Sequence, residues 1–383
     1  MFHAPIWRLL ILLFAIAPLA YYVVAIMAAN RFFRRKLPPV PSRPEPPVSL
    51  LKPVHGVDFA SYENFASFCQ QNYGAYEVLF CVNDLDDSAV PVIERLKKEY
   101  PQIPIRLFSG APQIGTNRKV NNLALLTKES RYETLVQTDG DVRVGRDFLK
   151  NLIAPLANPN VGVVSCLYRG IAEPNLGAEL EAIGAASDFL AGAMVADWKE
   201  GVSFALGAAV ATTKTWLKKI GGYEGIADYL ADDYEIGNRA CRAGAVVLLS
   251  HEPVWTMYPA QTFSSLWQHQ VRWARTLRLV RPWSYVGLIV TQGLPWAVAA
   301  ALCGPTFTVA AVYLAAYVVL RLTMAWMVGV KSLGDDVLKR RLWLVPLRDA
   351  IHFFVWIAGF TSNRVTWNGA NYTVRDGKMA PIS

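Results

Sequence analysis

Residues 134–144, Thr-Leu-Val-Gln-Thr-Asp-Gly-Asp-Val-Arg-Val, constrain the fold of this chain most strongly. The segment begins as an apolar β run and then places two carboxylates, Asp139 and Asp141, on either side of Gly140. A buried parallel strand has no place for carboxylates in its interior, so we expect the pair at the sheet edge where open α/β sheets bind ligands. Oxygen ligands at this spacing suit a hard divalent cation that bridges nucleotide phosphates. A solvated turn is the alternative, because Asp and Gly are common in turns.

Strand and helix patterns alternate around this segment. We expect further strands at 48–53, 76–84 and 105–108, separated by helices at about 58–73, 89–100 and 117–127. In the second half we expect strands at 161–168 and 204–210, helices at about 177–195 and 228–242, and an amphipathic basic helix at 263–280. The alternation with short connections predicts an α/β domain, a parallel sheet with helices on both faces.

Composition places part of the chain in a membrane. Hydrophobic residues make up 53% of the 383 residues, which is too apolar for an ordinary soluble chain. Residues 9–29 form an uncharged apolar run that is long enough to cross roughly 30 Å of hydrocarbon. A basic cluster at 30–36 follows directly, so we expect a retained anchor rather than a cleaved signal, and residues 37–281 in the cytoplasm.

Two further apolar segments follow the amphipathic helix. Residues 282–330 contain Gly304-Pro305, which predicts a hairpin of two spans, and Arg321, which we expect to snorkel toward the membrane surface. Residues 342–360 carry Arg348-Asp349 in their middle, so a re-entrant or interfacial helix is expected rather than a clean span. The expected domains are an anchor (1–36), a cytoplasmic catalytic domain ending in the amphipathic helix (37–281), a membrane hairpin (282–330), and a re-entrant or interfacial helix with a tail (331–383).

The net charge of +8 is concentrated in clusters that flank the apolar segments, at 31–36, 272–281 and 339–341. This distribution indicates an anionic lipid surface rather than a nucleic acid as the partner. The five cysteines are odd in number and show no paired spacing, which fits a reduced compartment and no zinc site.

Polar residues also follow the second and third expected strands. Asp84 and Asp87 could accept hydrogen bonds from a base or a ribose, or could cap the next helix. Lys119 and Asn122 could contact phosphates and a base where a loop enters a helix, or could belong to a plain surface loop.

Two constellations in the second half could carry catalysis. Asp232 and Asp233 are adjacent acids, so one should have a raised pKa if the site is partly buried, as suits a general base. A solvated helix start is the alternative. In His269-Gln-Val-Arg-Trp, Arg272 could contact a leaving diphosphate and Trp273 could stack on an acceptor. The alternative for this segment is a helix that lies on the membrane surface, and one helix could serve both purposes.

Taken together and in this order, these segments resemble the ceramide glucosyltransferase family (glycosyltransferase family 21), which includes the bacterial hopanoid-biosynthesis glycosyltransferases. The likeness runs from residue 48 to about residue 281 and resumes at the tail. The matching segments are 48–58, 76–87, 119–123, 139–144 and 231–234. The resemblance implies a GT-A nucleotide-diphospho-sugar transferase domain with one N-terminal and two to three C-terminal transmembrane or interfacial helices.

The resemblance also implies roles for single residues. The family's three aspartates fall on Asp87, Asp139 and Asp233, the last as the presumed base, and its Arg-Trp pair falls on Arg272 and Trp273. The family usually has Gln or Arg where this chain has His269, so the role of that position stays open. The implied nucleotide-binding residues are Lys52, Pro53, Asp84, Asp87, Lys119, Asn122 and Asp139, and the implied metal ligands are Asp139 and Asp141.

The implied function is inverting, non-processive transfer of a hexose, glucose or N-acetylglucosamine, from a UDP-sugar to a hydroxyl of a membrane lipid. The lipid would be a hopanoid such as bacteriohopanetetrol, or ceramide, and the cofactor Mg²⁺ or Mn²⁺. The catalytic domain would face the cytoplasm at a bacterial inner membrane. One alternative is a processive polysaccharide synthase, which normally needs more spans. The other is a non-catalytic membrane protein with a degenerate nucleotide fold. The oligomeric state is left open.

Overall fold

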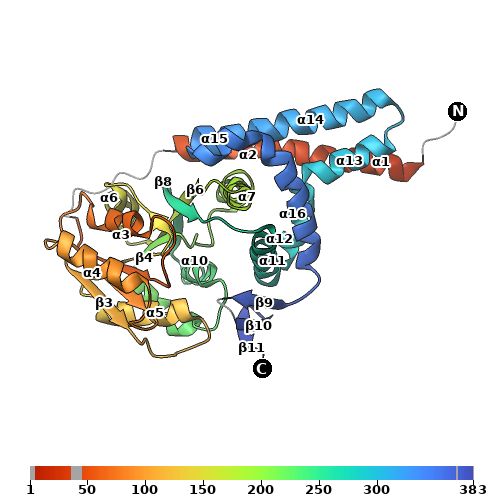
Figure 1. The fold of residues 1–383 in the computed structure, drawn as a ribbon. Helices are drawn as coiled ribbons and strands as arrows, with labels where there is room; N and C mark the ends of the chain where they lie inside the picture. Colours follow the sequence, from red (N-terminus) through yellow and green to blue (C-terminus); the bar gives the residue numbers. More distant parts are fainter. Residues whose placement is uncertain (1–4, 36–44, 368–369, 383) are drawn as a thin grey trace. The chain divides into compact units, whose positions relative to one another are not determined.

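The computed structural model describes residues 5–35, 45–367 and 370–382 (Figure 1). The chain forms two compact units that interleave along the sequence. We call Lys36–Tyr168, Glu200–Pro259 and Tyr372–Ser383 the sheet unit, and Met1–Arg35, Arg169–Lys199 and Ala260–Asn371 the helical unit. The expected domain boundary at 36 and 37 lies outside the described residues. The domain boundaries expected at residues 281 and 330 separate a catalytic domain from membrane segments, and they stay a prediction.

An eight-stranded sheet runs in the order β3-β2-β1-β4-β7-β6-β8-β5. Its strands are β1 (Val48–Pro53), β2 (Tyr76–Val82), β3 (Ile105–Ser109), β4 (Thr134–Thr138), β5 (Val142–Arg143), β6 (Val161–Ala172), β7 (Ala209–Thr213) and β8 (Val246–Tyr258). Strands β1 to β4 pair in parallel. Strand β7 is antiparallel to β4 and β6, and β5 is antiparallel to β8. The expected parallel sheet is therefore confirmed for the first four strands only.

The helices of the sheet unit are α3 (Ser61–Cys69), α4 (Ala89–Glu99), α5 (Arg118–Glu129), α6 (Phe148–Ile153), α9 (Lys214–Lys219) and α10 (Asp232–Arg242), with short 3₁₀ turns η1 (Ala154–Ala157) and η3 (Glu224–Ile226). The strand expected at 204–210 was wrong in position, because only its last two residues belong to β7. The preceding segment packs on α10 instead, where a Cβ at Gly237 would overlap the backbone of Phe204 and Ala205. Strand β8 was not expected, since Ser-His-Glu-Pro at 250–253 interrupts its apolar pattern.

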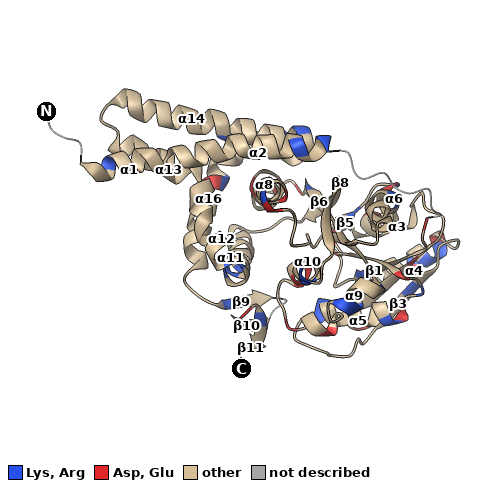
Figure 2. Ribbon diagram, turned by 180° about the vertical axis from the view of Figure 1, so that it is seen from behind, with Lys and Arg blue, Asp and Glu red and all other residues tan. Residues whose placement is uncertain are grey.

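The helical unit carries the apolar helices. Its elements are α1 (Ile6–Phe14), α2 (Ile16–Arg34), α7 (Leu176–Gly184), the π-helical turn η2 (Ala185–Phe189), α8 (Leu190–Glu200), α11 (Phe263–Val280), α12 (Pro282–Gly287), η4 (Leu288–Thr291), α13 (Gly293–Cys303), α14 (Phe307–Ala325), the π-helical turn η5 (Trp326–Ser332), α15 (Asp336–Arg341), η6 (Leu342–Leu344), α16 (Val345–Gly359) and β9 (Arg364–Trp367). Figure 2 shows α13 and α14 almost free of charged residues.

Three helical segments of the described chain are long and apolar enough to cross a membrane, Ile6–Arg34, Phe307–Ser332 and Asp336–Gly359. A fourth candidate, formed by Pro282–Thr291 and Gly293–Cys303, is bent by 53° and is either a broken span or a re-entrant loop. The expected Gly304-Pro305 turn lies between α13 and α14, as the hairpin prediction required.

Arg321 does not snorkel, contrary to expectation. The residue is 1% exposed, and its Nε and Nη2 donate to the two carboxylate oxygens of Asp349 at 2.9 and 2.7 Å. Nη2 also pairs with Asp188 on η2, and the Tyr317 hydroxyl donates to Asp349 at 2.8 Å. The sequence could not show this network, because Asp188 lies 133 residues before Arg321.

The same network removes the reason for doubting a span at 342–360. Arg348 and Asp349 are both buried, and Arg348 donates to the Gln270 side-chain oxygen at 2.7 Å. A helix can lie in the hydrocarbon core of a membrane when its charged side chains contact partners within the protein. By length and apolar composition, Asp336–Gly359 qualifies as a candidate span.

We expect Arg321→Met to lower the free energy of unfolding by about 3–5 kcal/mol, because it leaves Asp349 buried without its cation. Asp349→Leu should be similarly costly, whereas the double variant Arg321→Met/Asp349→Leu should recover much of the loss. Thermal unfolding in detergent measures this, with the exposed Arg340→Met as the matched control. Equal stability of Arg321→Met and the control would contradict the expectation.

Candidate active site

The adjacent strands β2, β1 and β4 are parallel, so their carboxyl ends lie at one edge of the sheet. The loops that leave these ends carry most of the residues singled out in the sequence. Asp139 and Asp141 follow β4, Asp84 and Asp87 follow β2, and Lys52 and Pro53 end β1. These segments are far apart in the chain, and the order of the strands brings them to the same edge of the sheet.

Lys119 joins two acidic segments at this edge. Its Nζ lies 2.6 Å from Asp139 Oδ1 and 3.5 Å from Asp232 Oδ2. Burial opposes the charge on this ammonium, but Asp139 and Asp232 outweigh it and raise the pKa of Lys119 above its ordinary value. Lys119 is therefore a permanent cation between the turn after β4 and the start of α10.

Lys52 lies close to the same turn but is buried. Its Nζ donates to the backbone carbonyl of Asp139 at 2.7 Å and to Thr138 Oγ1 at 3.3 Å. Burial lowers the pKa of Lys52 to about 7. Burial, reinforced by the charge of Asp139, raises the pKa of Asp141 to about 7. Lys52 thus supports the turn through its backbone, and a cation near Asp141 would favour the ionised form of its carboxyl.

The donor set of this turn fits a hard divalent cation shared with a ligand. No group of three or more His, Cys, Asp or Glu side chains that could hold a metal occurs in the described part of the chain. Asp139 and Asp141 offer carboxylate oxygens only. Mg²⁺ is commonly held by one or two carboxylates together with substrate phosphates, and Mn²⁺ takes the same oxygen ligands. Two carboxylates beside an open sheet edge match that arrangement.

The adjacent acids Asp232 and Asp233 begin α10 instead of lying inside it. Asp232 is buried, and Asp233 is half-buried with its Oδ1 accepting from the Tyr234 N–H at 2.8 Å. Burial and the charge of Asp232 raise the pKa of Asp233 to about 7. One raised pKa in this pair is therefore confirmed, and the helix start is not a solvated one. A Cβ at Gly207 would lie 2.8 Å from Asp233 Oδ2, so glycine at residue 207 leaves room for the carboxylate in this position.

The acids after β2 contact mainly backbone. The carboxylate of Asp87 accepts from the N–H groups of Gly56 at 2.9 Å and of Ala89 at 2.8 Å, so it joins the loop after β1 to the first residue of α4. Asp84 is exposed and accepts from the Asp86 N–H at 3.0 Å. Contacts of Asp84 and Asp87 with a nucleotide stay a prediction.

Two other predicted residues complete the edge. Asn122 on α5 is buried, and its Nδ2 lies 3.5 Å from Asn83 Oδ1 in the loop after β2. The carbonyl of Pro53 lies 3.9 Å from the place where a Cβ on Gly140 would be. Asn122 thus ties α5 to the β2 loop, and Pro53 lies beside the Asp139–Asp141 turn.

The Arg-Trp element belongs to the helical unit, on α11. Arg272 is half-buried, and burial lowers its pKa to about 10. Trp273 is 42% exposed, and its ring meets the His269 ring edge to face with centroids 5.4 Å apart. Phe189 of η2 meets Trp273 in the same way at 5.9 Å. These residues therefore form a partly exposed aromatic cluster.

Comparison with known families decides the classification. The profile of glycosyl transferase family 21 matches residues 10–380 of the chain. The chain belongs to glycosyl transferase family 21.

Two curated relatives of this family 21 chain come from Caenorhabditis elegans. Ceramide glucosyltransferase 3 is 27% identical over 235 residues, covering 60% of this chain and 50% of its own length. Ceramide glucosyltransferase 1 is 26% identical over 256 residues, covering 66% of this chain and 54% of its own length. The chain thus spans about half the length of these relatives.

A solved structure supports the fold. A mannosyltransferase from Pyrobaculum calidifontis, in complex with GDP-Man and Mn²⁺, aligns with a TM-score of 0.53 and 18% identity. The alignment covers 92% of this chain and 99% of that chain. The likeness is one of fold, and it confirms the expected GT-A architecture.

Sequence reasoning missed the residues that hold the loop before α10. Asn117 caps α5, and its Nδ2 donates to the Tyr229 carbonyl at 2.9 Å. The backbone N–H of Asn117 donates to the Ala227 carbonyl at 2.8 Å. The cap of the helix that carries Lys119 therefore also fixes the loop that leads into Asp232 and Asp233.

The C-terminal hairpin holds this loop from a second side. It consists of β10 (Ala370–Arg375) and β11 (Lys378–Pro381). Met379 N–H donates to the Asp228 carbonyl at 2.7 Å, and Leu230 N–H donates to the Gly377 carbonyl at 3.2 Å. Thr116 Oγ1 lies between them, 2.6 Å from Asp228 Oδ1 and 3.2 Å from the Met379 carbonyl. The resemblance at the tail was the one sequence signal for this contact.

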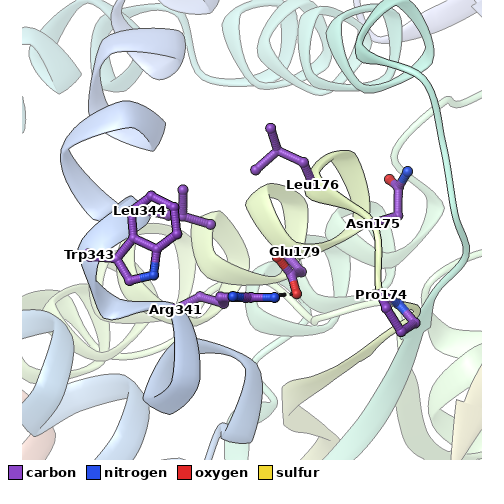
Figure 3. A pocket seen from close by; sticks show the side chains of 7 residues that line it. All are labelled: Pro174, Asn175, Leu176, Glu179, Arg341, Trp343 and Leu344. Carbon is purple, nitrogen blue, oxygen red and sulfur yellow. Dashed lines mark hydrogen bonds and ion pairs between the residues drawn. The ribbon is translucent and has the colours of Figure 1, made fainter.

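A separate pocket of about 290 Å³ opens in the helical unit (Figure 3). Its lining residues are Pro174, Asn175, Leu176, Glu179, Arg341, Trp343 and Leu344. An ion pair of 2.9 Å between Arg341 and Glu179 crosses it. None of the residues predicted for the active site lines this pocket.

We expect Thr116→Val to slow the sugar transfer proposed below by about tenfold, because small displacements of a reacting group are costly. The substitution keeps the side-chain shape but removes the hydroxyl that bridges Asp228 and the C-terminal hairpin. Thr116→Ser should restore the rate, and the affinity for the proposed UDP donor, measured by calorimetry, should stay unchanged in both. An unaltered rate in the valine variant, or an equal loss in the serine variant, would count against this role.

Proposed function

We propose that this family 21 protein transfers a hexose from a UDP-sugar to a hydroxyl of a membrane lipid, with inversion at the anomeric carbon. The observation that carries the proposal is the ion-pair network in which Lys119 joins Asp139 and Asp232, one residue from Asp233. This network supports the proposal because it joins Asp139, expected at the donor site, to Asp232, the neighbour of the expected base Asp233. The names of the curated relatives, ceramide glucosyltransferases, favour a lipid acceptor.

In this proposal Asp233 takes the proton of the acceptor hydroxyl while the hydroxyl oxygen attacks the anomeric carbon and the bond to UDP breaks. A base with a pKa near the working pH suits this step, and burial gives Asp233 such a pKa, about 7. Asp232 keeps Asp233 basic through its negative charge. Lys119 holds the acidic segments in place.

The donor would lie along the ends of β1, β2 and β4. The base and ribose would be contacted by Asp84, Asp87 and Asn122. The turn beside the diphosphate would be supported by Lys52 and Pro53. Bound at Asp139 and Asp141, Mg²⁺ or Mn²⁺ would supply positive charge to offset the charge developing on UDP. Arg272 would add to that charge, and Trp273 would contact the acceptor.

The proposal also includes the lipid acceptor and the orientation of the protein in the membrane. We favour a hopanoid such as bacteriohopanetetrol or a ceramide as the acceptor, glucose or N-acetylglucosamine as the sugar, and a cytoplasmic sheet unit at a bacterial inner membrane. Basic residues Arg31 and Arg34 close the candidate span Ile6–Arg34, as expected for a cytoplasmic end. Three or at most four candidate spans in the described residues favour a non-processive enzyme over a polymer-conducting synthase.

The direct test is to incubate membranes that contain the protein with labelled UDP-glucose or UDP-N-acetylglucosamine. Lipid extracts are then separated beside glycosylated ceramide and bacteriohopanetetrol standards. We expect label in one of these lipid products. Label in a polymer, or no transfer from either donor with Mg²⁺ or Mn²⁺ present, would overturn the proposal.

Asp233→Asn should lower the transfer rate by about 10²–10⁴, the typical cost of removing a positioned base. The affinity for the UDP-sugar should barely change, because the base acts on the acceptor. Asp232→Asn is the matched control and should keep substantial turnover, since its carboxylate faces Lys119. Single-turnover rates and calorimetric donor affinities measure the two effects. A reversed pair of phenotypes would move the base to Asp232.

Asp141→Ala should abolish the strengthening of UDP binding by Mn²⁺, because it removes one of the two carboxylates offered to the ion. Calorimetry with UDP in the presence of Mn²⁺ and in excess chelator gives a readout that does not depend on turnover. Asp86→Ala, an exposed acid in the loop after β2, is the control. Metal-independent UDP binding by the unaltered protein would refute the metal site.

A further inference from the structure

A buried carboxylate on α7, Glu181, contacts His269 on α11. Glu181 is buried, and its Oε1 contacts His269 Nδ1 while its Oε2 accepts from Gln261 Nε2. Burial favours the neutral acid, but the contacts with His269 and Gln261 and the nearby charge of Arg348 prevail and hold the pKa of Glu181 below its ordinary value. Glu181 is therefore an anion with both oxygens engaged.

This contact fixes how His269 presents its second ring nitrogen. A neutral imidazole that donates its Nδ1 proton to a carboxylate has an unprotonated Nε2, which is a hydrogen-bond acceptor. The His269 side chain is 34% exposed, and no hydrogen bond to Nε2 occurs within the described residues. The neutral form of His269 thus offers an oriented acceptor nitrogen to a ligand.

The surroundings of this nitrogen are apolar and aromatic. Trp273 is 42% and Phe189 39% exposed, and their rings lie in edge-to-face contact beside His269. Aromatic surface next to a single oriented polar atom suits a molecule whose hydroxyl is attached to an apolar body. A hydroxylated membrane lipid has that chemistry.

Joining α7 to α11 does not require the Glu181–His269 pair. Leu180 of α7 and Leu266 and Val271 of α11 belong to one buried apolar cluster. Such packing is favourable by itself, whereas burying a carboxylate costs desolvation. The pair therefore calls for a role beyond holding two helices together.

We propose that His269, oriented by Glu181, binds a hydroxyl group of the lipid acceptor, with Trp273 and Phe189 against the adjoining apolar part. The inference rests on the proposed function, because it names a contact of the same acceptor. His269 is the binding residue and Glu181 is a positioning residue. The hydroxyl donates its proton to Nε2 in a hydrogen bond, and no covalent change occurs at His269.

The test compares binding of two probes in detergent. One is a short-chain ceramide or bacteriohopanetetrol, and the other is its counterpart with the hydroxyl groups replaced by hydrogen. The unaltered protein should prefer the hydroxylated probe by about five- to tenfold, as expected for one hydrogen bond. His269→Ala should lose this preference, and Glu181→Gln should weaken it. His269→Gln, which restores an acceptor atom, should recover part of it.

Gln268→Ala, an exposed neighbour on α11, is the matched control and should keep the full preference. Where transfer is measured, His269→Ala should raise the acceptor KM and leave the donor KM and acceptor-independent UDP release unchanged. An undiminished preference in His269→Ala, or no preference in the unaltered protein, would overturn the inference. Hydroxyl-dependent binding without any sugar transfer would overturn the proposed function instead and leave this contact standing.

Discussion

The sheet unit depends on one cation placed between acidic segments. Lys119 lies within ion-pairing distance of both Asp139 and Asp232. Without that ammonium, the carboxylates after β4 and at the start of α10 would repel one another in a partly buried place. The Asn117 cap fixes Lys119 and the loop before α10 together, so one short segment sets the relative position of the acids after β4 and at the start of α10. The chemistry proposed for this protein needs those two groups of acids to stay close.

In the helical unit, too, ion pairs join segments that are far apart in the sequence. Arg321 is paired with Asp349 and Asp188, and Glu181 is paired with His269. A charge surrounded by apolar helices is costly unless a partner is present, so each one acts as a specific link between distant segments. The two units use their charges differently. Arg321 and Glu181 have partners within the helical unit, whereas burial and the charge of Asp139 raise the pKa of Asp141 in the sheet unit.

The C-terminal hairpin contacts the candidate site through backbone hydrogen bonds. The hairpin β10–β11 bonds to residues 228 and 230, immediately before the acid pair of α10. The position of Asp233, the proposed base, therefore depends on the backbone of residues 377 and 379.

Local patterns determined the elements whose signals are continuous in the sequence. The strands that became β1 to β4, helix α11 and the apolar segments were predicted because burial imposes a regular spacing on short stretches, and the acid pair at 139 and 141 marked a strand end. Tertiary structure alone decided how distant residues meet. The burial of Arg321, the antiparallel strand β8, the backbone contacts of Asp87 and the pairing of His269 with Glu181 all depend on partners far away in the chain. Whether a charged side chain is exposed or paired depends on its neighbours in space. The spacing of residues along the sequence does not identify those neighbours.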